Sequence, residues 1–237
     1  MFLQIVRAKR RQVLVDIDTQ KDFLLAEGKA CIRNHRRVLA HIRRVMAWAR
    51  SKDIPIISTC EVYPANGNGE GNGAKTYCID GTQGQQKVSY TLVSNRISLP
   101  ADGSTDLPRD MLRRYKQVIL YKRCIDPFDE PRIDRLLSEL QAAEFILIGV
   151  TAEAAVRATA LGLIQRDRKV IVVVDAVGTH DNHEARMALR KVQAKGARLI
   201  ETRRLAGISH LRKVGACHCE SCRRLAQKLP AGSPTDN

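Results

Sequence analysis

Short runs of apolar, mostly β-branched residues alternate along this chain with longer segments whose apolar residues recur at helical spacing. Continuous apolar runs are typical of strands buried on both faces of a parallel sheet. Such strands are predicted at residues 12–18, 54–59, 118–122, 144–150, 169–177 and 197–201. Helices are predicted at residues 33–51, 131–143, 153–166 and 182–195. The alternation predicts an α/β fold, with a doubly wound, mostly parallel sheet and helices on both faces.

The length and composition indicate one main domain. The chain has 237 residues, 44% of them hydrophobic, which is enough for a sizeable core. We predict a basic N-terminal extension at residues 1–10, an α/β domain at 11–205, a cysteine-rich segment at 206–228 and a disordered tail at 229–237. No apolar run reaches the roughly 18 residues of a transmembrane helix, and the apolar part of the N-terminus is too short for a signal peptide. We therefore expect a cytoplasmic protein.

The chain is strongly basic. Lysine and arginine number 40 against 25 aspartates and glutamates, so the formal net charge is +15. This excess favours anionic ligands through long-range attraction. Only 4% of the residues are aromatic, and no basic cluster is interleaved with aromatic residues as in proteins that bind single-stranded nucleic acids. We expect a solvated basic surface and a small anionic ligand, without specific nucleic-acid or membrane binding.

Three predicted strands end in segments that carry candidate chemistry. Asp18 lies in VDIDTQKDF, Lys122 in VILYKRCIDPF, and Ala155 in ILIGVTAEAAVRATA. Open α/β sheets bind their ligands at the carboxyl ends of the strands. The three segments are therefore expected to meet in one crevice.

These segments resemble the isochorismatase-like hydrolase superfamily, which includes isochorismatases, nicotinamidases and N-carbamoylsarcosine amidohydrolases. The resemblance covers about residues 11–205 and implies a Rossmann-like α/β fold and a homodimer or larger assembly. Most members carry an Asp, Lys, Cys triad, and here Ala155 stands at the cysteine's position. The matching residues are Asp18, Gln20, Asp22 and Phe23 in the first motif, Lys122 and Phe128 in the second, and Gly149, Val150, Glu153, Val156, Thr159 and Ala160 in the third.

The resemblance also implies the form of the substrate pocket. It implies a cis peptide between Val150 and Thr151, and a helix start whose amides at Ala154 and Ala155 could stabilise an oxyanion. Gln20 and Phe23 are candidate pocket residues, although packing and backbone hydrogen bonding are the commoner roles for such residues.

Replacement of the cysteine by Ala155 excludes a thiolate at that position. Isochorismatases offer a precedent, because they carry a small residue there and use the aspartate as a general acid on a vinyl ether. By this resemblance Asp18 would act as acid or base and Lys122 would attract an anionic substrate, with no cofactor required. A catalytically inactive binding or scaffold protein is the main alternative. A nucleophile displaced to Cys60 or Cys124 is a further one.

Metal binding is the remaining question. Nicotinamidases hold a divalent ion through an aspartate and a histidine after the second strand, where this chain has Glu61 and Tyr63, so we expect that this metal site is lost. The seven cysteines do not suggest a disulfide framework. Cys217, Cys219 and Cys222 could bind a structural zinc with His210 or His218, or remain free thiols. The glycine-rich segment 64–75 is either a lid or a plain surface loop.

Overall fold

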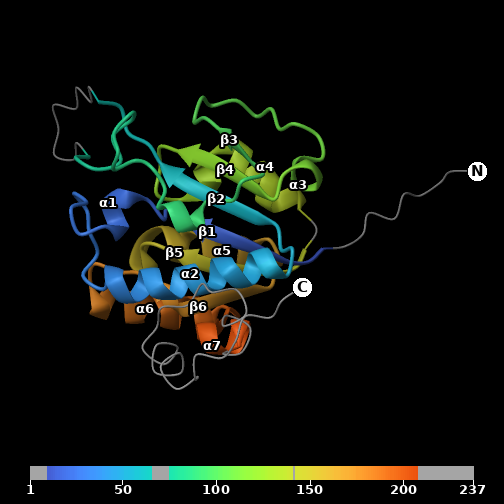
Figure 1. The fold of residues 1–237 in the computed structure, drawn as a ribbon. Helices are drawn as coiled ribbons and strands as arrows, with labels where there is room; N and C mark the ends of the chain where they lie inside the picture. The colour runs from blue at the N-terminus through green and yellow to red at the C-terminus, as the bar shows by residue number, and fades with distance from the viewer. Residues whose placement is uncertain (1–9, 66–74, 141, 208–237) are drawn as a thin grey trace, which may run out of the picture.

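The computed structural model describes residues 10–65, 75–140 and 142–207, and Figure 1 shows their arrangement. Within these ranges seven parallel strands form one sheet in the order β3-β4-β2-β1-β5-β6-β7. The strands are β1 Arg10–Ile17, β2 Ile56–Glu61, β3 Arg96–Leu99, β4 Gln117–Lys122, β5 Ala142–Gly149, β6 Val170–Val177 and β7 Arg198–Ile200. The predicted α/β fold with a parallel sheet is confirmed.

Helices cover both faces of the sheet. They are α1 Lys21–Leu24, α2 His35–Ser51, α3 Met111–Arg114, α4 Pro131–Glu139, α5 Arg157–Gln165, α6 Asn182–Ala194 and α7 Thr202–Ala206, with short helical turns η1 Ser89–Thr91, η2 Pro127–Asp129 and η3 Ala152–Val156. Alternate residues of β1 point into two hydrophobic cores. Val13 and Val15 pack with residues of α3 to α6, whereas Leu14 packs with α1, α2 and α7. This alternation follows from the period of two along a strand.

One sequence-based boundary was wrong, and one strand was missed. The helix predicted at 131–143 ends at Glu139, because Ala142 already pairs with β1 as the start of β5. The helix predicted at 153–166 is present within one residue at each end, and its first turn, Ala152–Val156, is π-helical before α5 continues to Gln165. The edge strand β3 has only four residues, and only Leu99 among them is buried, so its apolar signal is weak.

Several predictions fall on residues that the structure does not describe. The proposed zinc ligands Cys217, Cys219, Cys222 and His210 lie outside the described residues, as do most of the basic extension 1–10, nearly all of the cysteine-rich segment 206–228 and the whole tail 229–237. So does most of the predicted loop 64–75. In the part of the chain that is described, no helix is long and apolar enough to cross a membrane.

Candidate active site

Asp18 follows β1 directly and is held against the neighbouring strand β2. Its backbone lies in the left-handed region, with φ of 48°, which aspartate tolerates better than most residues. The Asp18 amide donates to the Thr59 carbonyl oxygen at 3.2 Å, and the Thr59 hydroxyl donates to Asp18 Oδ1 at 2.7 Å. Only 1% of Asp18 is exposed. The carboxyl group is therefore fixed in orientation and almost removed from solvent.

Lys122, the last residue of β4, reaches over β2 to Asp18. Its Nζ lies 2.8 Å from Asp18 Oδ2 and 3.4 Å from Glu61 Oε1, and it donates to the Cys124 carbonyl oxygen at 3.0 Å. Lys122 is fully buried. Burial alone would lower the pKa of Lys122, but the negative charges of Asp18 and Glu61 outweigh burial and raise it. The ammonium group thus stays charged at neutral pH.

Glu61 completes the cluster, although the sequence analysis considered it only as a former metal ligand. Its Oε2 accepts a hydrogen bond from the Tyr63 hydroxyl at 3.0 Å, while Oε1 faces Lys122. Burial raises the pKa of Glu61, and the charge of Asp18 raises it further against the opposing effect of Lys122. Two buried carboxyl groups therefore share one cation. A sequence signal existed, because Glu61 ends an apolar strand as Asp18 and Lys122 do.

The metal that the fold family implies does not fit these residues. Both carboxylate oxygens of Glu61 are engaged by Lys122 and Tyr63. A phenol is also a poor substitute for the imidazole ligands that zinc prefers. Within the described ranges, no group of three or more His, Cys, Asp or Glu side chains could hold a metal ion.

The rest of the first motif serves mainly to position the backbone. Gln20 uses its whole amide on the main chain: Nε2 donates to the carbonyl oxygens of Glu61 and Gln85 at 2.7 and 2.8 Å, and Oε1 accepts from the Glu61 amide at 2.8 Å. It holds Glu61 in place and is not free for a substrate. Asp22 Oδ2 accepts a hydrogen bond from the Cys78 amide at 2.7 Å. Phe23 is buried, and its ring lies edge-on to that of Tyr77 with 5.3 Å between the ring centroids.

The third motif begins where β5 ends beside β1. Register pairs Ile17 with Gly149, so Asp18 and Val150 emerge next to each other. Gly149 has φ of +123°, and a Cβ there would lie 1.9 Å from the Ile17 carbonyl oxygen, so only glycine permits this approach. The cis peptide between Val150 and Thr151 is confirmed.

The helix start differs from the one expected. In the π-helical turn the Ala154 amide donates to the Thr151 carbonyl oxygen at 3.2 Å, so it is not free to bind an oxyanion in this structure. Ala155 is 2% exposed and belongs to the hydrophobic core. Glu153 accepts from the Thr179 hydroxyl at 2.7 Å and from the His180 amide at 3.0 Å, which ties the turn to the loop after β6.

Cys60 and Cys124, which the sequence offered as alternative nucleophiles, have raised pKa values. Burial raises the pKa of Cys60 to about 12 and that of Cys124 to about 11. Both groups are therefore protonated thiols at neutral pH, and the thiolate is the nucleophilic form. Cys124 also donates its thiol to the Asp126 carbonyl oxygen at 3.0 Å.

A second buried ion pair lies beside the first. Lys87 Nζ is 2.9 Å from Asp16 Oδ2, which also accepts from the Ser58 hydroxyl at 2.9 Å. The Thr19 hydroxyl donates to Asp16 Oδ1 at 2.8 Å and accepts from Lys87 at 2.7 Å. Each group has a partner, and the pair joins the segment around Lys87 to β1. The sequence analysis did not identify this network.

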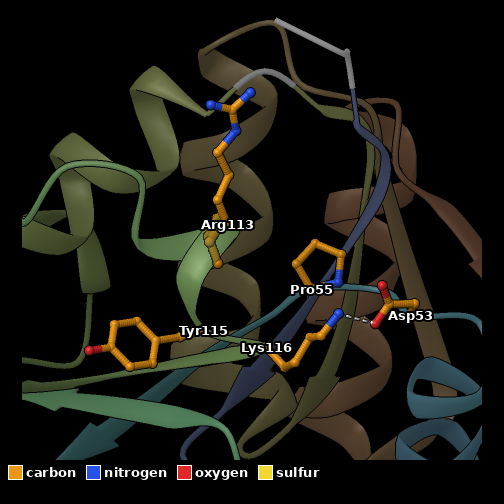
Figure 2. A pocket seen from close by; sticks show the side chains of 6 residues that line it. Asp53, Pro55, Arg113, Tyr115 and Lys116 are labelled. Atoms are coloured by element: carbon orange, nitrogen blue, oxygen red, sulfur yellow. Dashed lines mark hydrogen bonds and ion pairs between the residues drawn. The ribbon is translucent and has the colours of Figure 1, made fainter.

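A cavity of about 330 Å³ lies at the amino-terminal ends of β2 and β4, opposite the strand ends that carry Asp18 and Lys122 (Figure 2). Its lining includes Asp53 and Pro55 before β2, and Tyr115 and Lys116 before β4. Lys116 is paired with Asp53 at 2.5 Å. The six residues of β4 separate this cavity from Lys122 by roughly 20 Å at about 3.3 Å per residue. The cavity is therefore not part of the Asp18 site.

Comparison with known proteins supports the fold and the family. The computed structure is similar to the pyrazinamidase of Pyrococcus horikoshii in complex with zinc, with 20% identity over 81% of this chain and 99% of that chain and a TM-score of 0.64. It is also similar to the nicotinamidase of Bacillus subtilis, with 16% identity over 81% of this chain and 99% of that chain and a TM-score of 0.64.

A further similar structure is the MAR1 ribonuclease of Caenorhabditis elegans. The identity is 20%, the match covers 96% of this chain and 93% of that chain, and the TM-score is 0.55. No curated protein sequence matches this chain. The family model of the isochorismatase domain matches residues 12–204. This match spans the sheet, the helices and the Asp18 cluster, and the chain therefore belongs to the isochorismatase domain family.

Proposed function

We propose that this protein is a hydrolase that acts on a small anionic substrate by acid and base catalysis, without a covalent intermediate. The observation that carries the proposal is the buried cluster in which the Lys122 ammonium lies between the carboxyl groups of Asp18 and Glu61. Ala155, at the position proposed for the nucleophile, offers only a methyl group. The remaining chemistry is proton transfer and charge stabilisation.

The cluster supplies both parts of that chemistry. Two carboxyl groups beside one cation do not ionise independently, and the raised pKa of Glu61 means that the cluster retains a proton more readily than an exposed carboxyl does. Lys122 remains positive and attracts an anionic substrate. The net charge of +15 adds a long-range attraction of the same sign.

The proposed reaction is hydrolysis of an enol ether. Asp18 in its protonated form gives its proton to the enol carbon, which leaves a cation stabilised by the ether oxygen. Water adds to that cation, and the resulting hemiketal breaks into a ketone and an alcohol. The proton released by water returns to the carboxylate, so the enzyme is regenerated. A correctly placed general acid contributes about 10² to 10⁴ in rate.

The burial of the cluster adds a requirement. Asp18 is 1% exposed and Lys122 is 0% exposed, so a substrate reaches them only if a covering segment moves. Many enzymes have a segment that opens to admit substrate and closes to exclude water from the active site. A protein in which no such opening occurs would be catalytically inactive, and an assay of turnover distinguishes the two cases.

The test uses the purified full chain with isochorismate and related enol ethers, and it follows ketone release with a coupled dehydrogenase. Wild-type turnover is expected, and Asp18→Asn, which keeps the shape but cannot supply the proton, should reduce it by at least about 10². The exposed substitution Asp129→Asn is the matched control and should leave turnover unchanged. Ligand binding without turnover across the panel would refute the proposal and favour an inactive binding protein.

Hydrolysis of RNA is a second candidate function. The similar structure named a ribonuclease matches 96% of this chain, whereas the pyrazinamidase and nicotinamidase structures match 81%. The net charge of +15 suits a polyanionic substrate. The test is cleavage of end-labelled RNA by the full chain, with Asp18→Asn purified in parallel. Equal cleavage by both preparations would indicate a contaminating nuclease and would refute this candidate.

A further inference from the structure

Helix α2 carries an unusual concentration of positive charge. Its residues His35–Ser51 include five arginines and no aspartate or glutamate. The apolar side chains of the helix, such as Val38, Ile42 and Val45, are buried in the core, so the arginines occupy the remaining surface. Of the five arginines, Arg36, Arg37 and Arg50 are exposed and Arg43 is half-buried, whereas Arg44 is buried and does not belong to this surface.

These arginines lack acidic partners in the described part of the chain. None of the five forms an ion pair there, whereas arginines elsewhere do, among them Arg132 with Asp102 and Arg166 with Asp134. Arg44 is 7% exposed, and its Nε has no hydrogen-bond partner among the described residues. A buried guanidinium without a counter-charge is costly. The exposed arginines of α2 likewise have no counter-charge among the described residues, and their surface therefore favours an anionic partner.

The helix start strengthens this conclusion. Arg36 and Arg37 lie in the first turn of α2, where the exposed amides already create a positive potential, and no acidic residue is present there. This placement destabilises an isolated helix and stabilises a bound anion. Arg36, Arg43 and Arg50 are seven residues apart, which places them along one side of the helix at intervals of about 10.5 Å.

An aromatic ring lies under one of these arginines. The Arg43 guanidinium is 4.5 Å from the centroid of the Tyr90 ring, and Arg50 Nη1 donates to the Tyr90 carbonyl oxygen at 3.2 Å. A guanidinium plane supported by a ring is a surface on which a nucleobase can stack. The sequence analysis expected no basic cluster with an aromatic residue, because Tyr90 is far from α2 along the chain. The fold brings them together.

The character of the surface favours nucleic acid over other anionic partners. All five basic side chains with permanent charge are arginines, whose guanidinium forks match phosphate groups. Amphipathic helices that insert into a membrane interface carry exposed apolar side chains beside the basic ones. Among the described residues the exposed large hydrophobic side chains are Ile125 and Met187, and neither belongs to α2 or η1.

We propose that the α2 arginine face, formed by Arg36, Arg37, Arg43 and Arg50 with Tyr90, binds single-stranded RNA. The arginines contact phosphates, and a base stacks on Arg43. The choice of RNA rests on the second candidate function. The surface itself rests on the arginines, and it does not require that the Asp18 site cleave the strand.

The test measures binding of fluorescein-labelled single-stranded RNA to the full chain by anisotropy over a range of salt concentrations. The triple variant Arg36→Ala, Arg37→Ala, Arg50→Ala removes three exposed charges. Each lost phosphate contact should reduce the slope of log affinity against log salt by about 0.7, so the slope becomes shallower by about 2. Over a fourfold rise in salt, wild-type affinity should then fall roughly 18-fold more than that of the variant.

A matched control removes the same charge from the opposite face of the sheet. Arg186, Arg190 and Lys191 are exposed on α6, and their replacement by alanine should leave the salt slope unchanged. Equal weakening by both triple variants would show that net charge alone is responsible and would overturn the proposal. An absence of RNA binding at low salt would also overturn the proposal. The same would hold if the α2 variant bound RNA as the wild type does but no longer bound vesicles of phosphatidylcholine and phosphatidylserine.

Two single variants separate stacking and catalysis from phosphate binding. Tyr90→Leu should weaken RNA binding with an unchanged salt slope, because it removes the ring that supports the Arg43 guanidinium. The loss should be smaller than the roughly 5- to 150-fold expected for removal of a ring on which a base stacks directly. Unchanged affinity would refute the stacking contact. Failure of the hydrolase proposal leaves this one standing, because binding of RNA to the α2 arginines is measured without turnover. Loss of RNA binding in Asp18→Asn with intact folding would place binding at the other site.

Discussion

Replacing Lys122 by methionine should strongly destabilise the protein. Methionine fills a similar volume but leaves Asp18 and Glu61 buried without the cation that lies 2.8 and 3.4 Å from their oxygens. Removal of one partner from a buried ion pair costs about 3–5 kcal/mol. Because two carboxyl groups lose the same cation, we expect the upper part of this range, about 4–5 kcal/mol near pH 8. That is a large share of the 5–15 kcal/mol by which domains are stable.

The loss should depend on pH. Glu61 has a folded pKa raised above its ordinary value of 4.5, so its contribution to stability is fully present below that value and is lost as pH rises through the folded pKa. Without Lys122 this pKa rises further. The destabilisation should therefore shrink as pH falls from 8 towards 5, by up to about 1.4 kcal/mol per pH unit where the carboxyl takes up its proton. The raised pKa of Lys122 keeps its own contribution constant over this range.

Urea unfolding followed by the fluorescence of Trp48 provides the measurement. Trp48 is the single tryptophan, is 6% exposed and packs in the core under α2. Lys87→Met is the matched control, because Asp16 keeps the hydroxyl donors Ser58 and Thr19 after the lysine is removed. We expect a loss near 3 kcal/mol for it, with less pH dependence. A Lys122→Met loss below about 1 kcal/mol near pH 8, or one that is constant down to pH 5, would refute the reasoning.

Three further outcomes follow from the site. Glu61→Gln keeps the hydrogen-bonding shape but removes the titratable carboxyl. It should lower kcat/KM by about 10² or more and alter the acidic limb of the pH profile of kcat/KM. An unchanged profile would exclude Glu61 from proton transfer. Gly149→Ala should lower the free energy of unfolding in urea by more than about 3 kcal/mol, because its Cβ would lie 1.9 Å from a backbone oxygen. Gly196→Ala, which has a positive φ but open space around it, should lower it by about 1 kcal/mol. Similar losses in the two variants would contradict the steric argument. In Ala155→Cys, the new thiol should react with iodoacetamide at neutral pH more slowly than the half-buried Cys124 does, because position 155 is 2% exposed and lies in the hydrophobic core. Peptide mass spectrometry can measure both rates, and a faster reaction would show that the site still activates a thiolate.

Most of the fold could be predicted from the sequence because its signals are local. The apolar runs that became β1, β2, β4, β5 and β6 are continuous and buried on both faces, and the period of α2 and α6 is clear. Prediction failed where the local signal was weak or ambiguous. The segment after Glu139 continues a plausible helix, and only its pairing with β1 makes Ala142 a strand residue.

The site shows the same division. Asp18 and Lys122 could be predicted to converge because both end strands of a parallel sheet, and their ion pair bears this out. The role of Glu61 depends on β2 lying between β1 and β4, which places its carboxyl beside Lys122. The stack of Arg43 on Tyr90 likewise joins elements that are distant in the chain. Sequence alone determined which segments become strands and helices and where charged groups end them, because apolar periodicity is a local property. Tertiary structure decided which of those groups share a proton, a cation or a surface, because such contacts depend on strand order.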